Sequence, residues 1–185
     1  MKCFELFRES ARELRRVRSL TLAAMLLAIQ VLLGFVASIP IGPNIRISFG
    51  YLALSSAGAL LGPAVAPING ALADIIGFLL KPTGPYFPGF TITGIVSGLI
   101  YGLMLYRRDI TLTRLLVTKL LIDVICNLLL NTLWLNMLYG KAFFVLLPGR
   151  ALKNLLQYPV DVLLMYPVMK KVIPLVRKNM SQASR

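Results

Sequence analysis

The amino-acid sequence predicts an all-α membrane protein, a bundle of six transmembrane helices with both termini in the cytoplasm. Two observations support this prediction. First, 57% of the 185 residues are hydrophobic and the mean hydropathy is +0.77, well above the values of soluble domains. Second, apolar runs of membrane-spanning length alternate with short basic stretches, as helices and cytoplasmic loops do in membrane proteins.

The chain is strongly basic. Twenty Lys and Arg against seven Asp and Glu give a net charge of +13, which by itself would suggest nucleic-acid binding. The basic residues cluster between apolar runs, which favours cytoplasmic loops, so we expect no nucleic-acid partner. The absence of His and the presence of only two Cys, Cys3 and Cys126, exclude His-based catalysis and argue against a zinc cluster or a disulfide.

The N-terminal part divides into a basic segment and a first span. Residues 1–19 are polar and basic, and Glu5, Glu9 and Glu13 recur every four residues, which predicts an amphipathic helix on the inner membrane surface. Residues 20–39 carry no charge and are long enough to cross the bilayer. This length argues against the alternative of a cleaved signal peptide.

Five further apolar segments follow. They are residues 48–61, 63–80, 90–106, 113–138 and 146–173. The first of these is short for a span, so we expect it to be tilted or sunk into the bundle. The Pro-rich residues 81–89 form a rigid loop. We therefore predict a membrane domain over residues 20–175 and a basic cytoplasmic tail over residues 176–185.

The distribution of basic residues sets the predicted orientation. With the N-terminus inside, most basic stretches are cytoplasmic, in accord with the positive-inside rule. The basic residues left at the outer face are Arg46, Lys81, Lys141 and Arg150. No Asp or Glu in the outer loops balances them, which favours an anionic ligand arriving from outside. Anionic lipid headgroups are the alternative.

Polar side chains recur at spacings of three and four residues in two predicted spans. In the fifth they are Lys119, Asp123, Asn127 and Asn131, followed by Trp134. In the sixth they are Arg150, Lys153, Asn154, Gln157 and Asp161. The third span adds Asn69 and Asp74. Because such spacing places each set on one helix face, we expect these faces to surround a substrate cavity that opens to the outer face.

Some of these residues have structural alternatives. We expect Lys119 to pair with Asp123, and Asp161 to neutralise a basic neighbour. Asn127 either holds helices together or contacts a ligand. Three aromatic residues either anchor the protein at the membrane interface or pack against a flat ring: Tyr86, Phe87 and Trp134.

The chain contains no visible energy source. It has no Walker A sequence, no catalytic pair and no convincing internal repeat of the kind that builds secondary transporters. A ligand-binding bundle of this kind depends on partner subunits for transport. Ala24 and Ala28 form a small-x-x-x-small pair in the first span, which lets another helix approach closely.

Four motifs carry a family resemblance over about residues 18–175. They are Arg46-Ile-Ser-Phe-Gly-Tyr-Leu-Ala-Leu54 followed by Gly62-Pro63 and the Asp74 segment, Pro82-Thr-Gly-Pro-Tyr-Phe-Pro-Gly-Phe-Thr-Ile-Thr-Gly94, Asn131-Thr-Leu-Trp-Leu135, and Pro148-Gly-Arg-Ala-Leu-Lys153. With them the chain resembles the S components of energy-coupling factor (ECF) transporters, specifically the folate family. The resemblance implies a cofactor-free vitamin binder in a bacterial plasma membrane. It would capture folate outside for ATP-driven uptake by a transmembrane coupling (T) subunit and two ATPases.

We assign hypothetical roles within this resemblance. The glutamate carboxylates of folate are bound by Arg46, Arg150 and Lys153. The pterin edge is hydrogen-bonded by Asp74 and Asn131, and the rings pack against Tyr86, Phe87 and Trp134. Residues 40–47 and 81–89 act as lids. The family's helix contact with the T subunit falls on Ala24 and Ala28.

Three alternatives stay open at this point. One is an S component for another vitamin, such as biotin, whose single carboxylate also suits a basic pocket. Riboflavin is neutral and thiamin cationic, so both fit the basic outer face poorly. The others are a stand-alone small membrane carrier and, least favoured by the absence of His and of a catalytic carboxylate pair, a membrane enzyme.

Overall fold

The computed structural model describes residues 3–36, 39–40, 46–82, 85–140 and 143–182. A short helix α1 (Cys3–Glu13) precedes the six predicted helical segments. The first four segments are α2 (Val17–Val36), α3 (Gly50–Leu61), α4 (Val65–Leu80) and α5 (Pro88–Leu105). The fifth joins α6 (Leu112–Leu121), a π-helix η1 (Ile122–Leu130) and α7 (Asn131–Tyr139). The sixth joins α8 (Phe143–Pro167), a π-helix η2 (Val168–Val172) and α9 (Ile173–Gln182).

The all-α prediction is confirmed, with one small addition. Residues Ile39–Pro40 and Arg46–Ile47 form two short antiparallel strands, β1 and β2, with Ile39 opposite Ile47. Among the described residues, three helices are long and apolar enough to cross a membrane: Val17–Val36, Pro88–Leu105 and Leu112–Leu138. Helices α3 and α4 are apolar but shorter.

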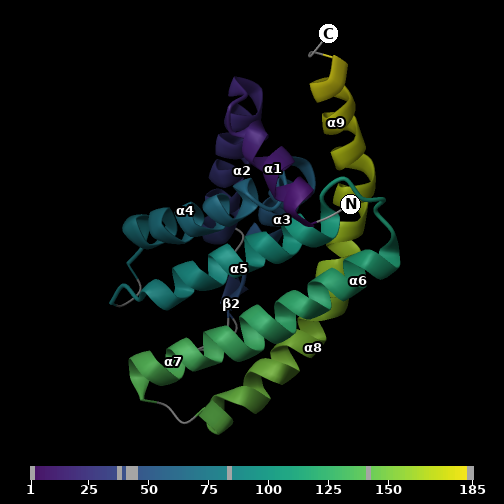
Figure 1. Ribbon diagram of the computed structural model, residues 1–185. Coiled ribbons are helices and arrows are strands. Elements are labelled where there is room, and N and C mark those ends of the chain that lie inside the picture. Colours follow the sequence, from purple (N-terminus) through teal and green to yellow (C-terminus); the bar gives the residue numbers. More distant parts are fainter. Residues whose placement is uncertain (1–2, 37–38, 41–45, 83–84, 141–142, 183–185) are drawn as a thin grey trace.

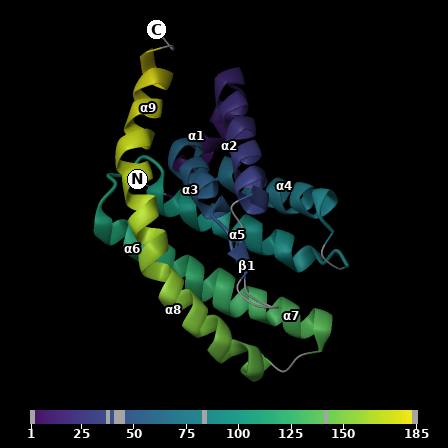
Figure 2. The same ribbon diagram turned by 180° about the vertical axis from the view of Figure 1, so that it is seen from behind.

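The long rods of the second half lie side by side. Helices α6 and α7 run antiparallel to α8. Helix α5 lies between α6 and α7 on one side and α3 and α4 on the other (Figure 1). The last rod changes direction between α8 and α9 (Figure 2). Pro167 and the wider turns of η2 lie at this change of direction, and both features are usual causes of helix kinks. The helix continues through the boundary that we predict at residue 176, as far as Gln182.

Small residues bring the backbones of α4 and α5 into contact. A Cβ atom added to Gly70 would lie 2.2 Å from the carbonyl oxygen of Gly94, and one added to Gly98 would lie 2.4 Å from that of Ala66. Neither position has room for a side chain. This close packing holds α4 and α5 together as one wall of the molecule.

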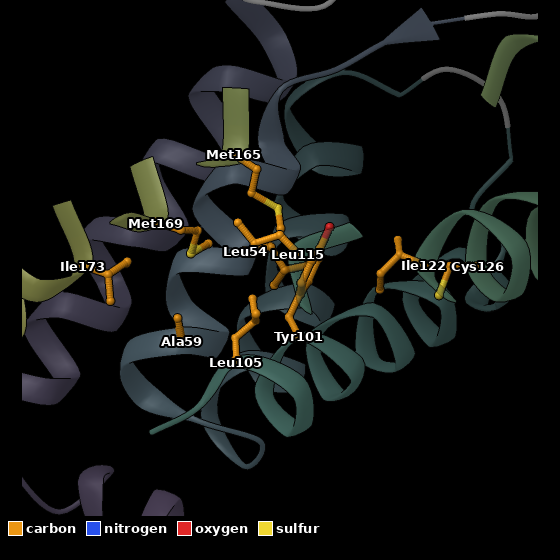
Figure 3. Close-up of a cluster of buried hydrophobic side chains, with 10 residues drawn as sticks. All are labelled: Leu54, Ala59, Tyr101, Leu105, Leu115, Ile122, Cys126, Met165, Met169 and Ile173. Carbon is orange, nitrogen blue, oxygen red and sulfur yellow. The ribbon is translucent and has the colours of Figure 1, made fainter. Parts of the chain in front are cut away.

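The main hydrophobic core lies where α3, α5, the α6–η1 segment and the α8–α9 rod meet. Figure 3 shows its side chains, which converge from these four elements: Leu54, Ala59, Tyr101, Leu105, Leu115, Ile122, Cys126, Met165, Met169 and Ile173. Cys126 is fully buried in this cluster, where it packs as a small hydrophobic side chain.

The N-terminal helix α1 is docked on the bundle. The hydroxyl of Ser10 donates a hydrogen bond to the carbonyl oxygen of Leu61 (2.6 Å) and accepts one from the amide of Ala64 (2.9 Å). Glu9 forms an ion pair of 2.9 Å with Arg107 in the α5–α6 connection. The predicted helix is therefore present, and its polar face is tied to the protein at the α3–α4 turn.

Candidate functional site

A cavity of about 690 Å³ lies between α2, α3, α4, α5, α7 and the loop before α5. Its polar lining includes Gln30, Ser48, Asp74, Lys81 and Asn131. Its aromatic lining consists of Phe35, Tyr51, Phe78, Tyr86, Phe87 and Phe90. A few polar groups among many apolar ones are typical of small-molecule sites, and the volume lies within their usual range of roughly 300–1,000 Å³.

Four of the predicted site residues line this cavity: Asp74, Tyr86, Phe87 and Asn131. Trp134, Arg150 and Lys153 are not among the lining residues. Of Arg46 the structure describes only the backbone, in β2. Lys141 lies outside the described residues, as do residues 41–45 of the first predicted lid and residues 83–84 of the second.

A hydrogen-bonded chain ties the loop before α5 to α4. The hydroxyl of Thr91 donates to Oδ2 of Asp74 (2.7 Å). The hydroxyls of Tyr86 and Thr91 are 2.7 Å apart, and because the single proton of Thr91 is already directed to Asp74, Tyr86 is the donor. The ring of Tyr86 also packs on Phe78, with centroids 5.1 Å apart. The carboxylate of Asp74 thus orients this loop at the edge of the cavity.

Trp134 supports the cavity wall from behind. Its ring packs on Phe87, with centroids 5.8 Å apart, and its indole N–H donates to the hydroxyl of Thr93 (3.0 Å). Gly89 makes this packing possible, because an added Cβ would lie within 2.5 Å of both rings. Trp134 therefore fixes the position of Phe87, which lines the cavity.

The polar stripe of the fifth span is a continuous hydrogen-bonded ladder. Asn131 donates to Oδ1 of Asn127 (3.4 Å), and Asn127 donates to Oδ1 of Asp123 (2.7 Å). Lys119 lies 2.7 Å from the same oxygen of Asp123 and 2.9 Å from Oδ2 of Asp161 on α8. The predicted pairing of Lys119 with Asp123 is confirmed, and Asp161 neutralises a basic neighbour as expected.

These ion pairs are buried. The side chains of Lys119, Asp123 and Asp161 are 4%, 9% and 1% exposed. Gln157 also donates to both oxygens of Asp161, at 3.3 and 3.1 Å. Buried charges are stable only when they are paired and hydrogen-bonded. This cluster therefore joins α6, η1 and α8, at the end of the ladder that is farther from the cavity and from Asn131.

Tyr51 connects the cavity to the buried charges, and the sequence analysis did not single it out. It lines the cavity, its hydroxyl donates to the carbonyl oxygen of Asp161 (3.5 Å), and Lys119 lies 5.2 Å from its ring centroid. In the sequence, only its position in the motif that begins at Arg46 indicated a role in the site.

Gln30 is the second lining residue that the sequence analysis missed. Its Oε1 atom is buried and has no hydrogen-bond partner among the described residues. A buried carbonyl oxygen without a partner is costly, and the residue that carries this one lines the cavity. A rotation of the side-chain amide would bring this oxygen to a ligand, from which it could accept a hydrogen bond.

The two predicted cations of α8 are half-buried and lie on the η1 side of that helix. The guanidinium of Arg150 donates to the carbonyl oxygen of Asn127 (3.4 Å). Lys153 is one turn further along and is also half-buried. Arg150 is therefore connected to the cavity through Asn127 and Asn131, although neither cation lines it.

Comparison with known proteins identifies the family. The family model of the ECF transporter substrate-specific component matches residues 18–169. A folate transporter FolT from Clostridium novyi (strain NT) is 38% identical over 130 residues, which cover 70% of this chain and 76% of the relative. The FolT of Leuconostoc mesenteroides is 33% identical over 156 residues, 80% of this chain and 83% of the relative.

A solved structure agrees with these relatives. The crystal structure of FolT bound with folic acid matches with a TM-score of 0.78 and 32% identity, over 84% of this chain and 95% of that one. The family comprises substrate-binding components of transporters, so the chain is not an enzyme. The matched residues 18–169 contain every residue that lines the cavity, and the chain belongs to the family of ECF transporter substrate-specific components.

Proposed function

We propose that this S component captures folate from outside the cell and holds it in the cavity between α2, α3, α4, α5 and α7. The observation that carries the proposal is the composition of the cavity wall, six aromatic side chains with Gln30, Asp74 and Asn131 between them. A pterin is a flat ring system with hydrogen-bond donors and acceptors along its edge. Both relatives reported above are folate transporters, and the matching structure holds folic acid.

In this proposal the pterin lies between aromatic rings. Phe87, held by Trp134, packs against one face. Asp74 accepts hydrogen bonds from the amino and ring N–H groups, as a carboxylate can. Gln30 and Asn131 supply amide groups whose donors and acceptors complement the remaining edge.

The glutamate tail of folate carries two carboxylates and needs cations. Arg46, Arg150 and Lys153 are the proposed partners, and Lys81, which lines the cavity near the loop before α5, is a fourth. An Arg guanidinium suits a carboxylate because it can donate two parallel hydrogen bonds. The ligand then extends from the aromatic wall towards the η1–α8 side, where Arg150 lies.

We further propose six transmembrane helices in the plasma membrane, with both termini in the cytoplasm. The membrane domain comprises residues 20–175, between a basic segment over residues 1–19 and a basic tail over residues 176–185. Labelling of single cysteines in intact cells tests this orientation. A cysteine at Pro85 should react with a membrane-impermeant reagent and one at Arg108 should not; the reverse pattern would contradict the proposed orientation.

Uptake requires partners in this proposal. Ala24 and Ala28 lie on an exposed face of α2, beside the exposed apolar side chains of Met25, Ile29 and Leu32. Small residues on an apolar helix face allow close contact with another helix. We assign this face to the T subunit, which couples the S component to two ATPases.

Calorimetric titration of the purified chain in detergent tests the ligand. The ligands are folic acid, 5-formyltetrahydrofolate, riboflavin, thiamin and biotin. Tight binding of folates alone supports the proposal. Tight binding of another vitamin would replace folate as the substrate, and the absence of any binding would contradict capture of these vitamins by the isolated chain.

A further inference from the structure

A second hollow lies at the opposite end of α5 from the substrate cavity. It has a volume of about 630 Å³ and lies between the α5–α6 connection and the η2–α9 rod. The two segments are neighbours in both ribbon views (Figure 1 and Figure 2). Four cationic side chains line it: Arg108, Lys170, Arg177 and Lys178. We call this hollow the basic groove.

The charge of the basic groove is unbalanced. Asp109 is the single carboxylate among its lining residues, against four cations. Among the described residues, the four cations form no ion pair within 4 Å. Concentrated positive charge in a partly enclosed groove attracts anions more strongly than the same charges spread over an open surface.

Two of the cations are held in place by the protein. The guanidinium of Arg177 donates to the carbonyl oxygen of Ala59 in α3 (3.2 Å). The ammonium of Lys170 donates to the hydroxyl of Tyr166 (2.7 Å). These contacts use one donor of each side chain, and an Arg has five and a Lys three, so the remaining donors are available to a ligand.

The uncharged residues of the groove are apolar. Ile110, Ile173 and Pro174 complete its lining. Close to these residues in the chain, α6 and α9 carry exposed apolar side chains, Leu112 and Leu175, which are 50% and 63% exposed. A ligand that matches both features has an anionic head and apolar chains.

We propose that the basic groove binds the phosphate headgroup of an anionic phospholipid, with the acyl chains along the apolar surfaces of α6 and α9. Basic pockets between membrane helices recognise such headgroups. The lipid would bridge the α5–α6 connection and α9, two segments that the sequence separates by more than sixty residues. The site is separate from the substrate cavity, so its occupation does not depend on the identity of the vitamin.

Lipid titration of the detergent-purified full chain, monitored by native mass spectrometry, tests the proposal. The ligands are phosphatidylglycerol, phosphatidylcholine with the same acyl chains, and soluble glycerol phosphate. We expect phosphatidylglycerol to bind at least tenfold more tightly than phosphatidylcholine. The double substitution Lys170→Gln with Lys178→Gln should weaken phosphatidylglycerol binding about 30-fold, since each cation near an anionic lipid contributes roughly fivefold.

A matched control has the same change of charge outside the groove, Arg12→Gln with Lys171→Gln. It should lower the affinity less than threefold, and thermal unfolding in phosphatidylcholine should be equal for both variants. If the groove variant unfolds early, Arg108→Gln with Lys178→Gln replaces it. Equal losses in the groove and control variants would overturn the proposal, because they would indicate diffuse surface charge. Displacement of the lipid by glycerol phosphate alone would also overturn it, in favour of a site for soluble phosphates.

Discussion

Replacing Lys119 by Met removes the cation that two buried carboxylates share. The ammonium lies 2.7 Å from Asp123 and 2.9 Å from Asp161, and the three side chains are at most 9% exposed. Met has nearly the length of Lys, so the packing volume changes little and the electrostatic change dominates. The substitution leaves the two buried carboxylates without the cation that they share.

The expected destabilisation follows from this burial. Removing one partner of a buried ion pair costs about 3–5 kcal/mol, whereas the loss of an ordinary hydrogen bond costs about 0.5–1.5 kcal/mol. For a chain of this length roughly 2–4 °C in Tm corresponds to each kcal/mol. Lys119→Met should therefore lower the Tm by roughly 6–20 °C.

Thermal unfolding in detergent, followed by circular dichroism, measures this change. Asp161→Asn should cost less than Lys119→Met, because it leaves a balanced Lys119–Asp123 pair and keeps an amide where Gln157 can bind. Lys171→Met, at an exposed position on η2, is the control and should shift the Tm by no more than about 2 °C, as expected for surface sites. The reasoning is refuted if Lys119→Met unfolds within the range of this control.

Four other substitutions test the ligand site, the helix packing and the partner face. Arg150→Ala should weaken folate binding by roughly 10–150-fold, equivalent to about 1.5–3 kcal/mol for a charged hydrogen bond; calorimetry that finds less than a twofold loss would remove Arg150 from the site. Gln30→Leu should weaken binding by roughly tenfold without lowering the Tm, because its Oε1 has no protein partner to lose; unchanged affinity would contradict this role. Gly70→Ala should destabilise the fold by about 1–3 kcal/mol, since its Cβ would lie 2.2 Å from a backbone oxygen of α5. The control Gly34→Ala should leave the Tm unchanged, because its Cβ would have no atom within 4 Å. Equal Tm values for these two variants would disprove the close contact. Ala28→Trp should abolish uptake into vesicles that contain the partner subunits and leave folate binding intact; normal uptake would exclude this face as the T-subunit contact.

Local spacing along the helices predicted much of the structure. The positions of Lys119, Asp123, Asn127 and Asn131, four residues apart, predicted a stripe on one face, and the structure joins them into one hydrogen-bonded ladder. This success has a simple cause, because residues i and i+4 are neighbours on any helix. The π-helix η1 widens the turns here without breaking the ladder.

The candidate site was predicted less completely. Asp74 and Asn131 stood out as polar residues in apolar spans, and both line the cavity. Gln30 also lies in an apolar run, but it has no polar partner three or four residues away, so no periodic signal marked it. Tyr51 is amphipathic and common at many depths of membrane helices, so its contacts with the cavity and with Asp161 could be found only in the folded chain.

The sequence by itself determined the helical class, the positions of the apolar helices and the polar faces, because each depends on neighbours a few residues apart. Only the tertiary structure decided which polar face meets the cavity. It directs Asn131 into the cavity and seals Lys119 against Asp161 on another helix. Such contacts depend on how helices pack across long stretches of chain, here through the backbone contact of α4 with α5 at Gly70, and no local pattern specifies that geometry.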